Sequence, residues 1–529
     1  MEKLSRKEIL YWIYWFGLAV IAASLPLSKY TMSIGQFLVL GAWMTDGFIQ
    51  RDLHLRFVMF FKNKAALALS SFYLLHIAGL TYTEDFGYAL QDLQLKITML
   101  MLPVVIATSP IMDQKNFRWL LIIHILAVLT GTLLSTYILA TRFIADLRDI
   151  FPFISHIRFG LNIDMAVFSL VYLIFYDRFY PGKIRVILLL LLIWLIVFLA
   201  LAELVTGLVI LVISFSAMVL YVAVKKNLSW LKLSWFLLAV GIPVGVFYYI
   251  QNITDQIWTP RPVDLKTLEA STPQGNPYFH DTAYKQIENG YLIYINIQYD
   301  ELREAWNGRS RLDYDGKDLK GQELKTTLIR FLTSKGLKKD ADGVKALTDL
   351  EITAVENGIV NTVYLSESSL KVRIYETLWE FYALKFNPDP SGRSLIQRFE
   401  FWKASWRIFV KNWLIGTGTG DVKNAFRAEY EEMKTLLAEQ YRWRSHNQYL
   451  SVLVTFGLPG ILVFMFSLFY PLRKTGNGGD YFVFTILSIT LLSMITEDTL
   501  ENQAGCTFFY FFYTLFLFGK RDEHRVIRP

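Results

Sequence analysis

His446 stands between two arginines and a long apolar run, in the stretch RWRSHNQYL (442–450). Histidine exchanges a proton readily near neutral pH, which suits a general base. Arginine matches the oxygens of a phosphate with two parallel hydrogen bonds, so Arg442 and Arg444 suit an anionic substrate. The stretch therefore predicts a base beside phosphate-binding groups. Position alone leaves two alternatives open: Asn447 as the cap of a helix, and arginines that reach toward lipid headgroups.

Two more arginines are expected at the same surface as His446. Arg398 opens a helical stretch ahead of it, and Arg158 lies in FISHIRFGLN (153–162), directly before an apolar run. Both belong to connections on the side of the membrane that holds few lysines and arginines. A binding role would explain why they are kept there.

The stretch 398–415 predicts a helix with two different faces. Aromatic residues recur three and four positions apart, and basic residues recur every four positions. Such a helix suits a membrane–water interface, where rings lie at headgroup level and cations face phosphates. The alternative is that the rings pack on a membrane bundle and the basic stripe is solvated. The aromatic residues are Phe399, Trp402, Trp406, Phe409 and Trp413, and the basic residues are Lys403, Arg407 and Lys411.

The same helix ends in the glycine run GTGTG (416–420), which permits sharp turns and a close approach of backbone. It lacks the Lys-Ser/Thr ending of a nucleotide-binding loop. A phosphate cradle and a plain turn both remain open.

Other chemistries find little support in the sequence. The chain has no HExxH motif, and its single cysteine, Cys506, excludes an intramolecular disulfide. Two Asp-x-Asp pairs can in principle hold a divalent ion, but both lie in lysine-rich sequence far from the other candidate groups. We therefore expect no metal site. The pairs are Asp313 with Asp315 and Asp340 with Asp342.

The composition indicates which elements position these residues. The 529 residues are 53% hydrophobic and 16% aromatic, which is typical of a protein with many membrane helices. A run of roughly 20 apolar residues spans a bilayer, and the sequence holds twelve candidates. We therefore expect an all-α polytopic membrane protein with about 12 transmembrane helices. The runs lie at about 9–27, 32–48, 65–82, 94–112, 117–141, 163–178, 184–203, 205–224, 232–251, 447–471, 480–497 and 503–519.

The distribution of lysine and arginine predicts the orientation. Alternate connections and the two ends carry 21 of these residues, and the intervening short connections carry 4. The positive-inside rule then puts both termini in the cytoplasm. The first group is Lys3, Arg6, Lys7, Arg51, Arg56, Lys62, Lys64, Lys115, Arg118, Arg178, Lys183, Arg185, Lys225, Lys226, Lys232, Arg473, Lys474, Lys520, Arg521, Arg525 and Arg528; the second is Lys29, Arg142, Arg148 and Arg158.

Three domains follow from this layout. An N-terminal bundle of nine spans covers 1–251, and a large, mostly helical periplasmic loop with the interfacial helix 398–415 covers 252–446. A C-terminal segment, 447–529, holds three spans and a cytoplasmic tail.

Two stretches resemble a known family. SHNQYLSVLVTFGLPGILVFMFSLF (445–469) resembles the His-Asn-x-x-Leu signature of the bacterial O-antigen ligase and O-antigen polymerase family, in which a glycine-containing apolar helix follows the histidine. SLIQRFEFWKASWRIFVKNWLIGTGTGD (394–421) resembles the family's Arg-x-x-x-Trp helix and its Gly-x-Gly-x-Gly turn. TEDTLENQAGCTFFYFF (496–512) is similar to the C-terminal segment of one branch of ligase-type members. The motifs cover roughly 394–512, and the expected layout fits the family over the whole chain.

The resemblance implies a glycosyltransferase of the GT-C type in the bacterial inner membrane. Its donor is a glycan on undecaprenyl diphosphate, and its reaction is inverting and metal-independent. Membrane lipids and lipid A–core are the other expected partners; no cofactor and no nucleic acid is expected. His446 would be the general base for the acceptor hydroxyl. Arg398 matches the family's loop arginine and is assigned to the diphosphate, where preplaced positive charge lowers the barrier most. Candidates for contacts with the acceptor or with phosphates are Arg442, Arg444, Asn447 and Arg407.

One departure from the family pattern concerns the diphosphate. Many members carry Ser-Arg-Thr-Gly at the outer end of a span, where this chain reads ELVTG (203–207), with Leu204 and Val205 in place of Ser-Arg. Either Arg158 replaces the missing arginine or Arg398 carries more of the load. The segment 265–393 is longer than a typical family loop, and its task is unassigned.

The leading interpretation is an O-antigen ligase of lipopolysaccharide biosynthesis, which transfers a complete polysaccharide to lipid A–core. An O-antigen polymerase or a protein O-oligosaccharyltransferase would use the same donor. A transporter or flippase is the alternative from another class. Such proteins more often show broken helices with charges at the membrane midplane, or a two-fold repeat, and the sequence shows neither.

Overall fold

The computed structural model describes residues 5–142, 147–177, 179–265, 267–366 and 369–520. Five of the lysines and arginines used to predict the orientation, namely Lys3, Arg178, Arg521, Arg525 and Arg528, lie outside these residues. The expected cytoplasmic tail lies mostly outside them as well.

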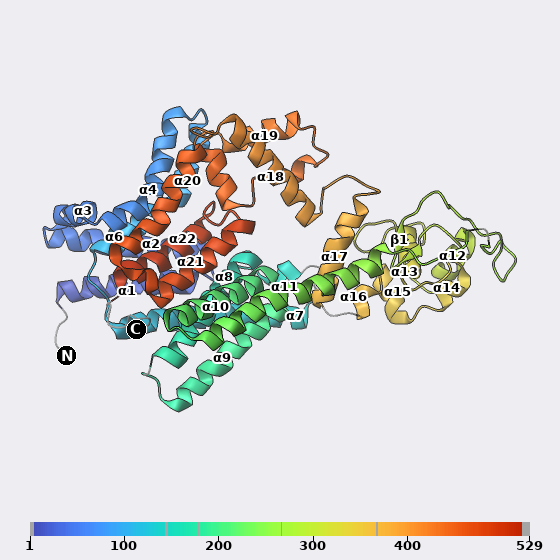
Figure 1. Ribbon diagram of the computed structural model, residues 1–529, viewed down its shortest axis with the longest axis horizontal. Helices are drawn as coiled ribbons and strands as arrows, with labels where there is room; N and C mark the ends of the chain where they lie inside the picture. Colours follow the sequence, from blue (N-terminus) through green and yellow to red (C-terminus); the bar gives the residue numbers. More distant parts are fainter. Residues whose placement is uncertain (1–4, 143–146, 178, 266, 367–368, 521–529) are drawn as a thin grey trace. The chain divides into compact units, whose positions relative to one another are not determined.

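The described chain is mostly helical (Figure 1). The helices are α1 (Arg6–Ser24), α2 (Lys29–Ile49), α3 (Leu53–Lys62), α4 (Lys64–Ala78), α5 (Phe86–Lys96), α6 (Thr98–Thr108), α7 (Gln114–Thr141), α8 (His156–Val171), α9 (Gly182–Leu201), α10 (Val205–Lys225), α11 (Ser229–Trp258), α12 (Tyr299–Asn307), α13 (Leu324–Ser334), α14 (Ala341–Lys345), α15 (Asp349–Glu356), α16 (Val363–Ser366), α17 (Ser369–Ala383), α18 (Ser394–Lys411), α19 (Val422–Glu432), α20 (Gln448–Thr475), α21 (Tyr481–Thr496) and α22 (Gln503–Thr514). Two short strands, β1 (Ile287–Glu288) and β2 (Tyr291–Leu292), pair in antiparallel register.

The chain forms two units. The first combines the residues up to Trp235 with those from Gln397 onward, and the second is Phe236–Ile396. The three-domain division expected from the sequence stays a prediction.

Eight described helical segments are long and apolar enough to cross a membrane. The expected count of about twelve is not shown, because α1 and α2 are not among the eight and the apolar helices of α21 and α22 are shorter. The structure also joins the expected run 94–112 to the residues before it, in one segment that begins at Phe86. The eight are Lys64–Tyr82, Phe86–Thr108, Gln114–Thr141, His156–Tyr176, Gly182–Leu201, Val205–Lys225, Lys232–Trp258 and Gln448–Thr475.

Polar caps fix where several of these apolar helices begin. An Asn or Asp side chain accepts a hydrogen bond from the first turn, which satisfies a backbone donor that the helix itself leaves unpaired. The apolar run that follows then needs no further polar partner. Such caps are Asn63 for α4, Asp85 for α5, Asp113 for α7, Asn447 for α20, Asp480 for α21 and Asn502 for α22.

The core of the first unit contains α22. Its sequence, QAGCTFFYFFYT, is apolar on nearly every side, and every residue from Ala504 to Thr514 is buried. A helix of this kind needs neighbours all around it, and α22 has contacts with α6, α8 and α21. The short connection between α21 and α22 is thereby held at the end of a rigid core.

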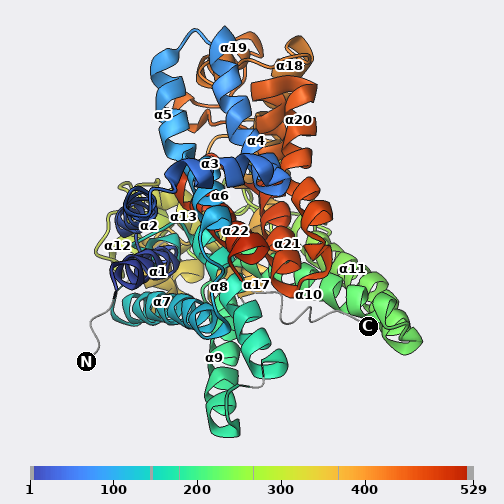
Figure 2. The same cartoon turned by 90° about the vertical axis from the view of Figure 1, so that its left-hand side faces the viewer.

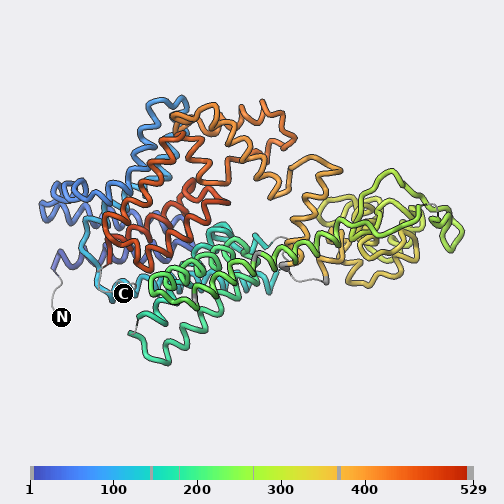
Figure 3. The backbone as a smooth tube through the Cα atoms, viewed as in Figure 1, coloured from blue at the N-terminus to red at the C-terminus, as the bar shows by residue number. Residues whose placement is uncertain are grey.

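Helices α4 and α20 lie side by side although they are far apart in the sequence (Figures 1 and 2). The ring of Phe72 on α4 packs against Phe456 and Phe464 of α20, with ring centroids 6.3 and 4.8 Å apart. In Figure 3 the orange and red chain of α18 to α22 returns to the blue N-terminal helices. This packing fixes the start of α20, where His446 lies.

The second unit has its own apolar core. Trp306, Tyr314, Leu328 and Phe331 are buried in it together with residues from α14 and α15. Helices α13 and α17 also belong to this unit.

Candidate functional site

His446 lies directly before the cap of α20. Asn447 caps the helix, because its Oδ1 accepts a hydrogen bond from the Leu450 amide at 3.0 Å. His446 itself has a φ of +44°, a left-handed conformation that costs a residue with a side chain roughly 1–2 kcal/mol. Something outside the helix must hold it there.

Asp498, on the connection between α21 and α22, holds this strained turn. Its Oδ2 accepts the His446 amide at 3.2 Å, and its Oδ1 accepts the Asn447 amide at 2.8 Å and the Ser451 hydroxyl at 2.8 Å. Burial raises the pKa of Asp498, while the charge of Arg444 and the Ser451 hydroxyl act in the opposite direction. One carboxylate therefore fixes both the backbone of His446 and the first turn of α20.

The neighbouring Glu497 faces the imidazole. Its Oε2 lies 3.7 Å from His446 Nδ1, and its Oε1 accepts a hydrogen bond from Arg398 Nη2 at 3.2 Å. The ring of Phe401 stacks on the imidazole at a centroid distance of 5.5 Å. Burial alone would raise the pKa of Glu497, but the contact with His446 and the charges of Arg398 and Arg158 outweigh it and lower the pKa. Glu497 is therefore an ionised carboxylate that faces the imidazole of His446.

Arg158, in the first turn of α8, belongs to the same cluster. Its charge acts on Glu497, and its Nη1 donates to Ser155 Oγ at 2.9 Å. Its Nε is buried and makes no hydrogen bond within the described chain. The structure thus gathers three residues predicted from the sequence, His446, Arg398 and Arg158, around Glu497, which the sequence reasoning missed. Two signals were present, the acidic connection EDTLENQ (497–503) and the resemblance of 496–512 to a family segment, but neither had assigned a role to Glu497.

A second, deeper cluster surrounds Glu501. Its carboxylate accepts hydrogen bonds from Lys96 Nζ at 2.7 Å, Arg444 Nη1 at 3.2 Å and Gln448 Nε2 at 3.0 Å. Burial would raise the pKa of Glu501, but the charges of Lys96 and Arg444 lower it far below the usual range. Lys96 is only 2% exposed and also pairs with Asp92 at 2.8 Å. Arg444, predicted as a phosphate contact, thus has a protein carboxylate as its partner.

The basic stripe of α18 also has acidic partners. Arg407 pairs with Glu429 and, at 3.0 Å, with Glu432 of α19. Lys411 reaches the same two glutamates, each at 2.6 Å. The charges of Arg407 and Lys411, which were expected to face phosphates, are therefore neutralised by the protein.

The aromatic residues of α18 are divided between two environments. Phe399 and Trp406 are about half exposed, whereas Phe409 is buried. The helix begins at Ser394 and ends at Lys411 rather than at 415 as expected, so the half-exposed Trp413 lies just beyond it. The interfacial role of this helix stays a prediction.

The glycine run 416–420 packs against the middle of α20 and forms backbone hydrogen bonds with it. Helix α20 breaks at Gly457, whose φ is +63°, and the freed carbonyls of Val454 and Thr455 accept the amides of Thr417 and Gly418 at 2.9 and 3.0 Å. A Cβ on Gly416 would lie 2.3 Å from the Phe456 amide nitrogen. The run needs glycine for this close approach, and the Thr417 and Gly418 amides are already used rather than free for a phosphate.

A cavity of about 340 Å³ lies beside the stretch that leads to His446. We call it the cation cavity. Tyr88 of α5, residues of α19 and the connection before α20 line it. Arg442, another predicted contact residue, is part of its wall, where its Nε donates to the Leu437 carbonyl at 3.0 Å. Its charged residues are Lys423, Arg427, Glu439, Arg442 and Arg444.

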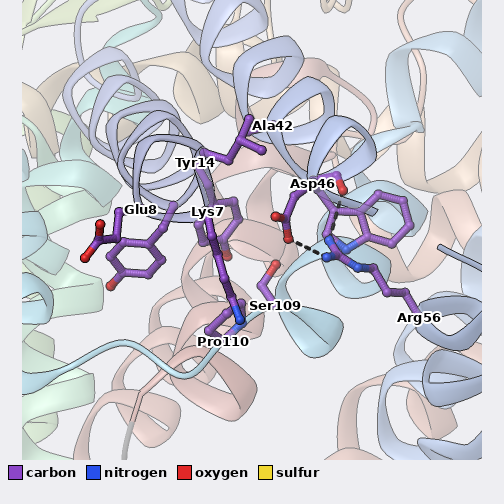
Figure 4. Close-up of a pocket in the computed structure, with 11 residues that line it drawn as sticks. Lys7, Glu8, Tyr14, Ala42, Asp46, Arg56, Ser109 and Pro110 are labelled. Atoms are coloured by element: carbon purple, nitrogen blue, oxygen red, sulfur yellow. Dashed lines mark hydrogen bonds and ion pairs between the residues drawn. The ribbon is translucent and has the colours of Figure 1, made fainter. Parts of the chain in front are cut away.

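Another cavity of about 340 Å³ lies between α1, α2 and the end of α6 (Figure 4). Arg56 points toward Asp46 there, and it also pairs with Asp52 at 2.8 Å and donates to the Trp43 carbonyl at 2.9 Å. None of the residues predicted for the site lines it. Its arginine is thus satisfied by protein groups.

The Asp-x-Asp pairs lie in the second unit and have protein partners. Asp315 pairs with Arg303 at 2.7 Å, and Asp342 with Lys345 at 3.3 Å. Asp340 caps α14 by accepting the Gly343 amide at 2.8 Å.

Comparison with protein families identifies a domain that begins in the second unit and continues into the first. Residues 354–465 match the family model described as O-antigen ligase. The chain has an O-antigen ligase domain. This domain occurs in O-antigen ligases and polymerases, enzymes whose substrates are lipid-linked glycans. The matched residues include Arg398, Arg407, Arg442, Arg444, His446 and Asn447.

Two partners of this domain lie outside the matched residues: Arg158 before it and the acidic connection with Glu497, Asp498 and Glu501 after it. No curated protein matches the chain. The O-antigen ligase domain and the eight candidate spans together are consistent with a multi-pass membrane protein.

Proposed function

We propose that this protein is an O-antigen ligase, which transfers a polysaccharide from undecaprenyl diphosphate to lipid A–core. The observation that carries the proposal is the cluster around Glu497. The ionised carboxylate of Glu497 lies 3.7 Å from His446 Nδ1 and 3.2 Å from Arg398 Nη2. The positive charge of Arg158 also acts on this carboxylate. A base and two guanidinium groups at one place are what glycosyl transfer from a diphosphate requires.

His446 acts as the general base. Nδ1 faces Glu497, which leaves Nε2 for the substrate, and the side chain is 35% exposed. Nε2 takes the proton of the acceptor hydroxyl while that oxygen forms a bond to C1 of the donor sugar. The bond from C1 to the diphosphate oxygen breaks with inversion, and its electron pair leaves with the diphosphate. Glu497 stabilises the imidazolium that forms.

The arginines stabilise the leaving diphosphate. Arg398 and Arg158 supply positive charge where negative charge grows in the transition state. The reaction on this scheme needs no metal ion. Arg158 Nε is buried and makes no hydrogen bond among the described residues, so the protein does not use this donor.

Arg158 takes the place of the arginine that the ELVTG stretch lacks. Gly207, two positions after Val205, lies against Gly160, two positions after Arg158: a Cβ on Gly207 would come within 3.4 Å of Gly160 Cα. The first turns of α8 and α10 are therefore neighbours. The guanidinium group of Arg158 on α8 can therefore lie where many family members place an arginine at the start of the helix that corresponds to α10.

The remaining expectations belong to the same proposal. The protein lies in the bacterial inner membrane with both termini in the cytoplasm, and the site is on the periplasmic side. Residues 1–251 form the N-terminal bundle, 252–446 the loop domain and 447–529 the C-terminal segment.

The test is an in vitro transfer assay with purified protein, undecaprenyl-diphosphate glycan and lipid A–core in the presence of EDTA. We expect glycan-capped lipid A–core from the wild type and none from His446→Ala. Longer carrier-linked glycans alone would make the enzyme a polymerase. Transfer to a protein acceptor alone would make it a protein O-oligosaccharyltransferase, and glycan translocation that survives His446→Ala would make it a flippase.

A further inference from the structure

The cation cavity has an excess of positive charge that the protein does not neutralise. Four cations and one carboxylate line it. In the described part of the chain, Lys423, Arg427 and Arg442 form no ion pair, whereas Arg444 pairs with Glu501. Unmatched charge in a small cleft concentrates counter-ions of the opposite sign.

Other charged residues near the cation cavity do have partners of opposite charge. On α19, Glu429 and Glu432 hold Arg407 and Lys411 of α18. The similar-sized cavity of Figure 4 likewise contains an arginine, Arg56, that two aspartates satisfy. Lys423 and Arg427, one turn apart on α19, remain without such partners.

The size and the walls of the cavity suit a phosphorylated sugar. A volume of about 340 Å³ falls in the range of roughly 300–1,000 Å³ that small-molecule sites occupy. Tyr88, Tyr430 and Trp443 contribute aromatic surface, on which the apolar face of a sugar ring can pack. The guanidinium groups of Arg427 and Arg442 suit the oxygens of a phosphate.

The cavity is close to His446 but separate from the diphosphate arginines. Trp443 is three residues from His446, so the chain between them spans at most about 10 Å. Neither Arg398 nor Arg158 lines the cavity. A ligand bound there would therefore reach the imidazole without competing for the donor's arginines.

We infer that the cation cavity binds a phosphate group on a sugar of the acceptor and so positions the acceptor hydroxyl at His446. This inference rests on the proposed transfer to lipid A–core. It adds a second anion site, specific for a phosphate monoester on the acceptor, to the diphosphate site of the donor.

The first test compares Arg427→Glu with the matched charge reversal Lys434→Glu, an exposed lysine that does not line the cavity. Initial rates are measured in a detergent without anionic lipid, over a range of acceptor and donor concentrations. We expect Arg427→Glu to raise KM for lipid A–core about tenfold or more, with KM for the donor and kcat little changed. Lys434→Glu should behave as the wild type.

The second test removes the phosphates from the acceptor with a phosphatase. The wild type should then show the same rise in KM, and Arg427→Glu should show no additional rise. Full additivity of the two changes, an unchanged KM in Arg427→Glu, or a rise in donor KM instead would overturn the inference.

A binding measurement separates this inference from the proposed function. Delipidated core oligosaccharide is titrated into purified His446→Ala protein, which needs no turnover. We expect binding that is lost on dephosphorylation of the oligosaccharide and in the His446→Ala/Arg427→Glu protein. If the wild type transfers no glycan but this binding occurs, the proposed ligase function is wrong and the phosphate site in the cation cavity is confirmed. If transfer occurs and the phosphates make no difference to binding, the site alone fails. Binding that inorganic phosphate matches equally well would mean a free-phosphate site and overturn the acceptor assignment.

Discussion

Glu497 and Glu501 lie four residues apart on the same connection, yet the protein treats them differently. Glu501 is enclosed by Lys96, Arg444 and Gln448, and its charge is fully matched inside the fold. Glu497 has looser partners, His446 at 3.7 Å and Arg398 at 3.2 Å, and the imidazole remains partly exposed. The difference teaches how to distinguish a structural carboxylate from a functional one: the first has all of its partners in the protein, and the second shares partners that a substrate also needs.

The largest expected effect is on stability, from Glu501→Ala. Removing one partner of a buried ion pair leaves an uncompensated charge and typically costs about 3–5 kcal/mol. Asp92 would be the one carboxylate left to Lys96 among its described partners. Thermal unfolding of the purified variant in detergent should show a large loss of stability. Glu84→Ala, which removes an exposed carboxylate, is the control. A Glu501→Ala protein as stable as the control would show that the enclosed carboxylate is not structural.

Glu497→Gln should have the opposite profile. Without its charge the imidazolium is no longer stabilised, so kcat for glycan transfer should fall about 100-fold, at the low end of general-base contributions. Thermal stability should stay close to that of the wild type, because the amide still fills the same space. If the Glu497→Gln protein unfolds easily but has a normal kcat when folded, then Glu497 is a structural carboxylate like Glu501.

Arg158→Ala should have a smaller effect, about a tenfold fall in kcat/KM for the lipid-linked donor, because less charge then stabilises the leaving diphosphate. If Arg158 replaces the missing family arginine, then Val205→Arg in the Arg158→Ala background should recover part of the loss. The measurement is the initial rate over a range of donor concentrations. Val209→Arg, one turn further along α10 and exposed, is the control. If Val205→Arg and Val209→Arg both restore the rate, or if neither does, then Arg158 of α8 does not replace an arginine at position 205 of α10.

The smallest expected effect is a pH dependence of stability. The pKa of Glu501 is lowered in the folded protein, so its contribution is complete above the unfolded value of about 4.3 and is lost as pH falls toward the folded value. The difference in unfolding temperature between wild type and Glu501→Gln should therefore be constant from pH 7 to about 5 and shrink below about 4. A difference that grows on acidification would contradict this assignment.

Much of this site was predictable from residue types and spacing, and the rest was not for identifiable reasons. His446, Arg398 and Arg158 were expected to meet, and the structure brings them together around Glu497. Glu497 itself was missed because it lies some fifty residues after His446, and the family resemblance of 496–512 assigned no role to its acidic residues. Only the packing of α20 against α21 and the connection that follows it reveals the contact.

The basic stripe of α18 shows a second limit of sequence reasoning. A helix pattern predicts which residues share a face, but not what covers that face. Arg407 and Lys411 do share one, and Glu429 and Glu432 of the following helix cover it. The membrane segments show a third limit, because apolar runs predict helices such as α1 and α2 without deciding whether they cross a bilayer.

The break in α20 has a consequence for how the protein is made. Carbonyl groups released at membrane depth have no water to bind, and each unsatisfied group costs several kcal/mol. The donors that serve Val454 and Thr455 are the amides of Thr417 and Gly418, which a ribosome completes some forty residues earlier. The partners of the bend therefore exist before the bend enters lipid. Moving residues 413–420 to the far end of the chain, as in a circular permutant, would reverse that order and expose a broken helix during biogenesis.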